Sequence, residues 1–300
     1  MSSKHISRFL LVVVAFVVFS ARGQETQLLV SIPQPPAQME TLRERCNYIV
    51  DNYWKHFNYK GAFSSVDRLD ATLGEFIAVT PYASADTVFA AINSLIAGVE
   101  KTDGKNLVTL ARLAEKWCAT DTSEYRSEEL MIPFAQAVAK SKKVKGPEKE
   151  YYRLMAQRMT NSRTGVAPAD FEFTVSDGST GRLSEITTPT VLIFFYEPDD
   201  FDSRLALTRL GSDFVVKTLS RHNMLKVVAI YPGTPTEQWY ADAESMPDDW
   251  VTGAAPGIDE WFTINRKPHL YYLDEDRVIT DKDFSVDAAI MYFNQFLQKK

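Results

Sequence analysis

The stretch that most constrains the fold runs from Thr190 to Arg204 and reads TVLIFFYEPDDFDSR. Its apolar run, Val191 to Tyr196, carries no charge, which is typical of a strand buried on both faces of a sheet. The run ends at Glu197-Pro198, and apolar residues then recur at helical spacing. The stretch therefore predicts a buried strand that leads into a helix N-terminus, the place where open α/β sheets hold their ligands and catalytic groups.

Length and the first residues bound the organisation of the chain. Three hundred residues exceed one usual core and predict two domains. Basic residues precede eleven apolar residues, Phe9 to Phe19, and small residues follow them, so residues 1–23 are interpreted as a secretory signal peptide. Eleven apolar residues are too few for a membrane span, which takes about 20. Residues 24–36 are predicted to be a linker.

Charge restricts the partners. Removal of residues 1–23 takes away three basic residues and no acid, so the net charge moves from −6 to −9. An acidic chain without a basic patch does not suit nucleic acid or an anionic membrane surface. We therefore expect no nucleic-acid partner, and no transmembrane segment after cleavage.

The cysteine count excludes a redox dithiol within one motif. Cys46 and Cys118 are separated by 71 intervening residues, which fits neither a Cys-x-x-Cys pair nor a zinc framework. Two interpretations are open. The two residues form a disulfide, which would stabilise the fold by about 4 kcal/mol through closure of a long loop, or they are two buried unpaired thiols.

Residues 37–162 are predicted to form an all-helical domain. Apolar residues recur at intervals of three and four between Met39 and Phe57, which indicates an amphipathic helix. The same spacing predicts helices at about 67–79, 84–100, 106–118, 127–140 and 147–159.

From residue 163 the pattern changes to that of an α/β domain. Phe171, Phe173 and Val175 alternate with polar residues and predict a strand, and 182–186 either pairs back with it or begins a connector. The elements predicted after the buried strand are a helix at 203–221, a strand at 225–231, an irregular segment at 232–266 with a helical turn at 236–243, strands at 269–273 and 277–280, and a helix at 286–299. Strand, helix and strand in this order predict a right-handed parallel crossover.

This order of elements, with Pro268 directly before a strand, resembles the thioredoxin fold. Residues 166–300 resemble the TlpA and ResA branch of periplasmic thioredoxin-like proteins, because Gly165–Phe171 is similar to its opening G-x-x-A-x-D-F and Lys267–Asp274 to its cis-proline strand. Residues 39–160, especially YIVDNYWKHF from Tyr48, are similar to a helical domain of unknown function that precedes such modules in exported proteins of Gram-negative anaerobes. The resemblance implies a mixed central sheet flanked by helices, preceded by an all-α domain, in the periplasm or cell envelope of a Gram-negative bacterium.

The resemblance also locates an active-site loop. Phe195–Asp199 is similar to the family's Phe-Tyr-Asp-Pro-Asp, after which active members continue Cys-x-x-Cys, but here the two cysteine positions hold Asp200 and Ser203. A carboxylate and an unactivated hydroxyl do not carry out disulfide exchange. An aspartate at a helix N-terminus is nevertheless stabilising, by about 0.5–2 kcal/mol. The active-site loop implied in this way comprises Tyr196, Glu197, Pro198, Asp199, Asp200, Phe201, Asp202 and Ser203, and the cis-proline strand supplies Lys267, Pro268 and His269.

Other residues of this region are assigned structural roles. The acidic residues of the loop lack the spaced oxygen ligands of a calcium loop, so we expect helix capping and no metal site. His269 has no nucleophile motif nearby and is expected to be a surface strand residue. Trp239, Trp250 and Trp261 are expected to fill cores rather than a ligand groove. No cofactor pattern and no catalytic residue are predicted.

The sequence thus predicts an exported, redox-inactive thioredoxin-like protein that binds a polypeptide or an envelope component. In the family, the proline leaves the preceding backbone free to take an extended peptide, so the predicted surface is Tyr196–Ser203 with Arg266–His269. Two alternatives are open. The chain is a thiol-disulfide oxidoreductase accessory that uses Cys46 and Cys118 or a partner's thiols, or the helical domain carries the function.

Overall fold

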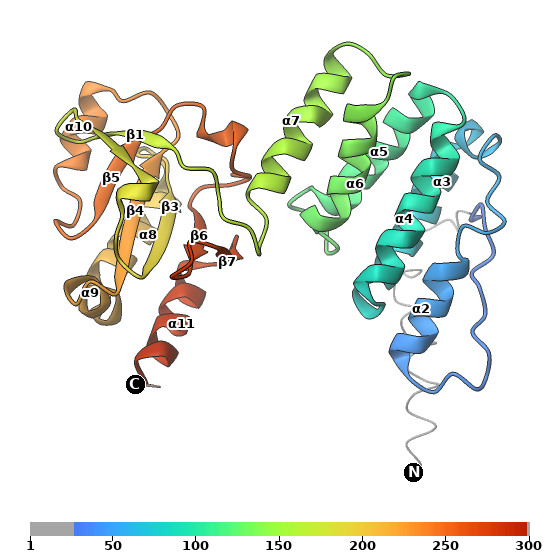
Figure 1. Ribbon diagram of the computed structural model, residues 1–300, viewed down its shortest axis with the longest axis horizontal. Coiled ribbons are helices and arrows are strands. Elements are labelled where there is room, and N and C mark those ends of the chain that lie inside the picture. The colour runs from blue at the N-terminus through green and yellow to red at the C-terminus, as the bar shows by residue number, and fades with distance from the viewer. Residues whose placement is uncertain (1–26, 299–300) are drawn as a thin grey trace. The chain divides into compact units, whose positions relative to one another are not determined.

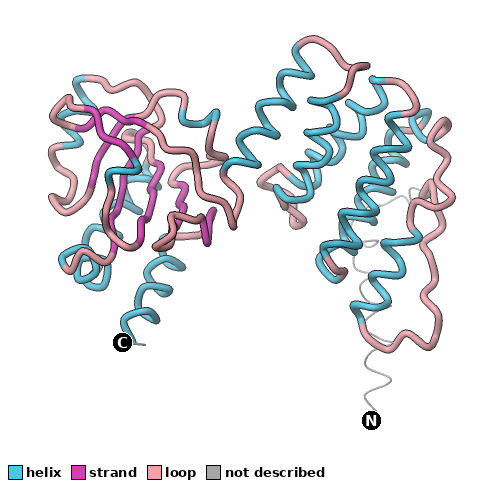
Figure 2. The backbone as a smooth tube through the Cα atoms, viewed as in Figure 1, coloured by secondary structure: helices cyan, strands magenta, loops and turns pink. Residues whose placement is uncertain are grey.

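The structure is a computed structural model that describes residues 27–298. The candidate signal peptide lies outside the described residues and stays a prediction. The chain divides into two compact units, Met1–Arg126 and Ser127–Lys300. Within the described residues, all strands, magenta in Figure 2, belong to the second unit. In that same range, no helix combines the length and the apolar character that a membrane crossing requires.

The first unit is helical. Its elements are α2 (Leu42–Asn52), η2 (Ala62–Ser64), α3 (Val66–Val79), η3 (Thr80–Tyr82), α4 (Ala85–Glu100) and α5 (Gly104–Cys118). Helix α2 begins at a capping box formed by Thr41 and Glu44. It ends earlier than the periodicity predicts, because the apolar spacing continues into a turn where Tyr53, Trp54 and Phe57 form a buried aromatic cluster.

The second unit contains one mixed sheet with helices. Its first elements are α6 (Glu128–Lys140), α7 (Pro147–Asn161), β1 (Glu172–Val175), β2 (Thr180–Arg182), η4 (Leu183–Glu185), β3 (Thr190–Phe195) and α8 (Phe201–Ser212). The remaining elements are α9 (Phe214–Arg221), β4 (Leu225–Tyr231), α10 (Glu237–Ala243), β5 (Val251–Ala254), η5 (Ile258–Glu260), β6 (His269–Leu273), β7 (Ile279–Lys282) and α11 (Val286–Gln298).

The sheet has the strand order β2-β1-β5-β4-β3-β6-β7. At its centre β3 pairs in parallel with β4 and antiparallel with β6, so that Phe195 lies opposite Ile230 and His269. Alternate residues of β3 enter two cores. Leu192 and Phe194 pack with α8, α9 and α11 on one face, and the other face packs against the segment that contains η5. Both faces of β3 are therefore covered, which accounts for its uninterrupted apolar run (Figure 1).

Two predictions about the second unit are wrong in detail. The helix predicted at 203–221 is broken into α8 and α9 at Asp213, whose carboxylate accepts hydrogen bonds from the N–H groups of Val215 and Val216 and so starts a new helix. The segment predicted to be irregular contains β5, which pairs in parallel with β4 and antiparallel with β1.

Helices α6 and α7 belong to the same compact unit as the sheet. Helix α7 contacts η5, and Lys282 of β7 bonds both Glu128 of α6 and the carbonyl of Ser162, the C-cap of α7. The compact unit thus begins at Ser127, whereas the sequence pattern changes after residue 162. The domain boundary at 162/163, which we predict from the change in sequence pattern, stays a prediction.

Candidate functional site

The loop predicted as an active-site loop connects the end of β3 to the start of α8. The N–H of Tyr196 donates to the carbonyl of Ile230 (3.1 Å), which continues the pairing with β4 one residue beyond β3. A turn follows, in which the N–H of Asp200 donates to the carbonyl of Glu197 (3.1 Å), with Pro198 at the second position that suits such a turn. The sequence therefore builds a tight, ordered connection at the carboxyl end of a central strand.

Asp200 and Ser203 hold this connection together. The Asp200 carboxylate accepts the N–H of Ser203 (2.7 Å) and is the N-cap of α8. The hydroxyl oxygen of Ser203, a buried residue, accepts the N–H of Glu197 (3.2 Å). The pKa of Asp200 lies below its usual value because the Ser203 backbone N–H bonds to the carboxylate, and the charges of Arg204 and Lys267 act in the same direction. Asp200 thus caps α8, and Ser203 ties the loop back to the first turn of the helix.

An open depression of about 320 Å³ lies in front of the loop. Its lining residues are Glu197, Asp200, Ile264, Asn265, Arg266 and Lys267. Lys267 forms an ion pair with Glu197, and Arg266 Nε lies 3.6 Å from Asp283 Oδ1. The depression therefore brings together the two predicted parts of the site, the active-site loop and the cis-proline strand. It also includes Ile264 and Asn265, which no periodic pattern in the sequence singles out.

The backbone of Ile264–Lys267 is unpaired. Within the described part of the chain, no hydrogen bond reaches the N–H or C=O groups of these four residues, although Phe262 before them and β6 after them are hydrogen-bonded. The peptide bond between Lys267 and Pro268 is cis. Asn265 and Arg266 are exposed, so this backbone is open to solvent.

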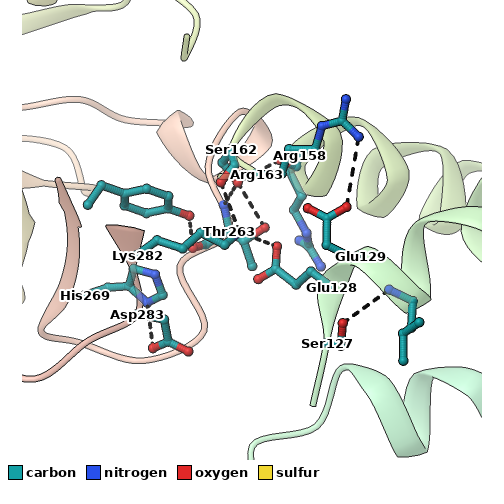
Figure 3. A network of polar contacts seen from close by, with 12 residues as sticks. Ser127, Glu128, Glu129, Arg158, Ser162, Arg163, Thr263, His269, Lys282 and Asp283 are labelled. Atoms are coloured by element: carbon teal, nitrogen blue, oxygen red, sulfur yellow. Dashed lines mark hydrogen bonds and ion pairs between the residues drawn. The ribbon is translucent and has the colours of Figure 1, made fainter. Parts of the chain in front are cut away.

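His269 is buried, and its predicted place on the surface is wrong. It is only 1% exposed, because β6 lies between β3 and β7 and all five of its residues are covered. Its Nδ1 lies 3.7 Å from the Asp283 carboxylate (Figure 3). The centre of its ring lies 5.1 Å from that of the Tyr271 ring. His269 therefore belongs to the interior beneath the site and not to the binding surface.

Two of the three tryptophans expected to fill cores are buried, and the third is exposed. Trp239 and Trp250 are buried, and the indole N–H of Trp239 donates to the hydroxyl of Tyr196 (2.9 Å). Burial raises the pKa of Tyr196 to about 12, so this hydroxyl stays protonated. Trp261, by contrast, is 44% exposed, and Phe201, the first residue of α8, is 69% exposed.

The two cysteines are free, buried thiols in the first unit. Burial raises the pKa of Cys118 to about 12 and also raises the pKa of Cys46. A thiol with a raised pKa is a poor nucleophile near neutral pH, because the thiolate is the reacting species. Of the two interpretations of these residues, the structure contains the unpaired thiols. Among residues 27–298, no group of three or more His, Cys, Asp or Glu side chains is placed to hold a metal ion.

Comparisons with known proteins place these features in context. Residues 14–162 match the model of a family described as a domain of unknown function, DUF5106. This match ends at the residue where we predict the boundary between sequence modules. The comparison with curated proteins gave no match.

Solved structures identify the fold. A thioredoxin-like protein from Bacteroides caccae is similar over 90% of this chain and 99% of its own, with a TM-score of 0.73 and 21% identity. A conserved protein of unknown function from Bacteroides fragilis matches over 44% of this chain and 98% of its own chain, with 28% identity and a TM-score of 0.42. The thioredoxin domain of a thiol-disulfide oxidoreductase from Bacteroides vulgatus matches over 45% of this chain and 97% of its own chain, with 17% identity and a TM-score of 0.37. The first likeness confirms the predicted fold, a helical region followed by a thioredoxin-like mixed sheet with flanking helices.

Proposed function

We propose that this chain is an exported thioredoxin-like protein of the TlpA and ResA branch, without dithiol activity, that binds extended polypeptide non-covalently. The observation that carries the proposal is the unpaired backbone of Ile264–Lys267 along an open depression. Water satisfies exposed backbone N–H and C=O groups in the free chain, and an extended peptide replaces that water by strand addition. The apolar run in residues 1–23 supports export to the periplasm or cell envelope.

The absence of thiols at the site supports the non-covalent mode. Asp200 and Ser203 occupy the positions that the resemblance assigns to the two cysteines. Asp200 caps α8, and the Ser203 hydroxyl accepts the N–H of Glu197. Cys46 and Cys118 are buried in the other unit. Disulfide exchange needs an accessible thiolate, so their burial disfavours the alternative in which they act as a redox pair.

The proposal is tested with an unfolded polypeptide that contains neither thiols nor disulfides. Fluorescein-labelled, reduced and carboxamidomethylated ribonuclease A is titrated with the full mature chain, and binding is followed by fluorescence anisotropy. We expect saturable binding that Asp200→Arg weakens at least about fivefold, because a long cationic side chain would fill the depression beside Lys267.

The matched control is Asp103→Arg. Asp103 is also a helix N-cap, accepting the N–H of Lys105 (2.9 Å) at the start of α5 in the first unit. This variant loses an equivalent cap and gains the same charge, but it leaves the depression intact, so its affinity should equal that of the unmodified chain. Equal affinities in all three proteins, or no binding at all, would contradict the proposal.

A further inference from the structure

Among the described residues, the stretch Ile264–Lys267 has no backbone hydrogen bonds, so its course depends on the residues at its two ends and on the side-chain contacts of Arg266 and Lys267. At the first end, the N–H of Thr263 donates to the hydroxyl oxygen of Ser162 (3.1 Å) and the carbonyl of Thr263 accepts the hydroxyl of Tyr271 (2.7 Å). Ser162 and Thr263 are 0% and 1% exposed. The stretch therefore starts from a buried, fully bonded residue.

Ser162 itself is held in place from two directions. It is the C-cap of α7, where its N–H (3.0 Å) and its hydroxyl (2.8 Å) both donate to the carbonyl of Arg158. Its own carbonyl accepts the ammonium group of Lys282 (3.0 Å). One serine thus connects the end of α7 to the residue from which the unpaired stretch begins (Figure 3).

The other end of the stretch is connected to the same cluster. Arg266 contacts Asp283, whose N–H donates to the carbonyl of Leu270 (3.0 Å) in β6. The preceding residue, Lys282, donates to Glu128 of α6 (2.6 Å) as well as to Ser162. The C-cap of α7 therefore bonds directly to the residue at the first end, and α6 bonds to Lys282, the residue before the Asp283 that Arg266 contacts.

We propose that Ser162 is a positioning residue of the binding site, so that the helices before the sheet complete the surface that takes the polypeptide. This inference rests on the proposed function, because it assigns Ser162 a part in binding. The bond by which Ser162 holds Thr263 is present without any ligand. Without the Ser162 hydroxyl, the buried N–H of Thr263 has no acceptor, and the stretch is released at its first end. A peptide that pairs with a released strand must first order it, and that cost lowers the affinity.

The test measures amide hydrogen exchange and polypeptide binding in the full mature chain with Ser162→Ala. We expect exchange of the Thr263 amide, which bonds to the Ser162 hydroxyl, to become about fivefold faster, the effect of losing one net hydrogen bond, while the amides of β3 are unchanged. The affinity for carboxamidomethylated ribonuclease A should fall by a similar factor. A purely structural role would instead speed exchange throughout the second unit.

Thr160→Val is the matched control, because Thr160 lies on the same helix and its buried hydroxyl has no hydrogen-bond partner in the described structure. It should change neither readout. If Ser162→Ala does not fold, Glu128→Gln decides the question. It keeps an acceptor for Lys282 but removes the charge, and it should speed exchange of the Thr263 amide about twofold.

Unchanged exchange of the Thr263 amide in the serine variant, or an equal change in Thr160→Val, would overturn the inference. The same holds if the unmodified chain binds the probe and Ser162→Ala binds it equally well. If the unmodified chain binds no probe, the proposed function fails, and the exchange result still decides whether Ser162 anchors the stretch.

Discussion

Lys282 of β7 places its ammonium group 2.6 Å from the carboxylate of Glu128, and both side chains are nearly buried, at 15% and 8% exposure. The two residues are 154 positions apart in the chain. The ammonium group also lies 5.7 Å from the centre of the Tyr271 ring. The pair therefore joins α6 to β7, an edge strand of the sheet, within the second unit.

Truncation of one partner of this pair should lower the free energy of unfolding. Glu128→Ala leaves Lys282 largely buried with only the Ser162 carbonyl to bond, and we expect a loss of about 2 kcal/mol in the free energy of unfolding, less than for a fully buried pair because some solvent reaches Lys282. Glu129→Ala is the control, since Glu129 is exposed and its contact with Arg163 is 4.0 Å long. It should cost less than about 0.5 kcal/mol. Urea denaturation followed by circular dichroism measures both, and equal losses would contradict the expectation.

The same contacts predict which fragment folds. Residues 127–300 keep the Glu128–Lys282 pair and the Ser162–Thr263 bond, whereas residues 163–300 lose both and leave Lys282 and the N–H of Thr263 without these partners. We expect fragment 127–300 to unfold cooperatively and fragment 163–300 to be less stable by at least about 3 kcal/mol. Denaturation of the two purified fragments tests this. Equal stability would mean that α6 and α7 are dispensable for the fold of the sheet.

Restoring two thiols should restore redox chemistry. Asp200 and Ser203 lie at the start of α8, where the helix N-terminus lowers the pKa of a cysteine and favours the reactive thiolate. The double variant Asp200→Cys with Ser203→Cys is therefore expected to catalyse the reduction of insulin by dithiothreitol, and the unmodified chain to leave the uncatalysed rate unchanged. The single variant Asp200→Cys, which lacks a resolving thiol, is the control. Activity in the unmodified chain would refute the redox-inactive assignment.

Burial of the cysteine thiols predicts a loss of stability in alkali. Cys118 has a pKa of about 12 in the fold against 9.0 for an ordinary thiol, so its protonated form is the one that the fold favours. Its contribution is complete below pH 9 and is lost as the pH rises from 9 to 12, by up to about 1.4 kcal/mol per pH unit. Urea midpoints of Cys118→Ala and the unmodified chain across this range test the prediction. Native thiols should also resist alkylation at pH 8 and react only after unfolding.

Much of the fold could be predicted because local patterns coincide with it. The run Val191–Tyr196 has no polar position, as a strand covered on both faces requires, and Asp200 is the kind of residue that starts a helix. Strand β5 was missed because Val251–Ala254 is short and contains Gly253, which weakens the strand pattern. The break between α8 and α9 has a sign in the sequence, because Asp213, an aspartate within the predicted helix, is also a candidate N-cap for a second helix.

The site could be predicted only in part. The residues next to the loop and the proline are sequence neighbours of recognisable motifs, and they do meet at one depression. Ser162, Thr263 and Lys282 come together only through the tertiary fold, and their residue types carry no local signal. His269 was misplaced because a strand with both faces covered has no exposed position, whatever the polarity of its residue.

The most direct test of the proposed function is amide exchange of the full mature chain with and without saturating carboxamidomethylated ribonuclease A. Strand addition would place new hydrogen bonds on the unpaired backbone, so the amides of Ile264–Lys267 should exchange at least about fivefold more slowly in the complex. Binding that leaves these amides unchanged, or that protects only amides of the first unit, would contradict the account.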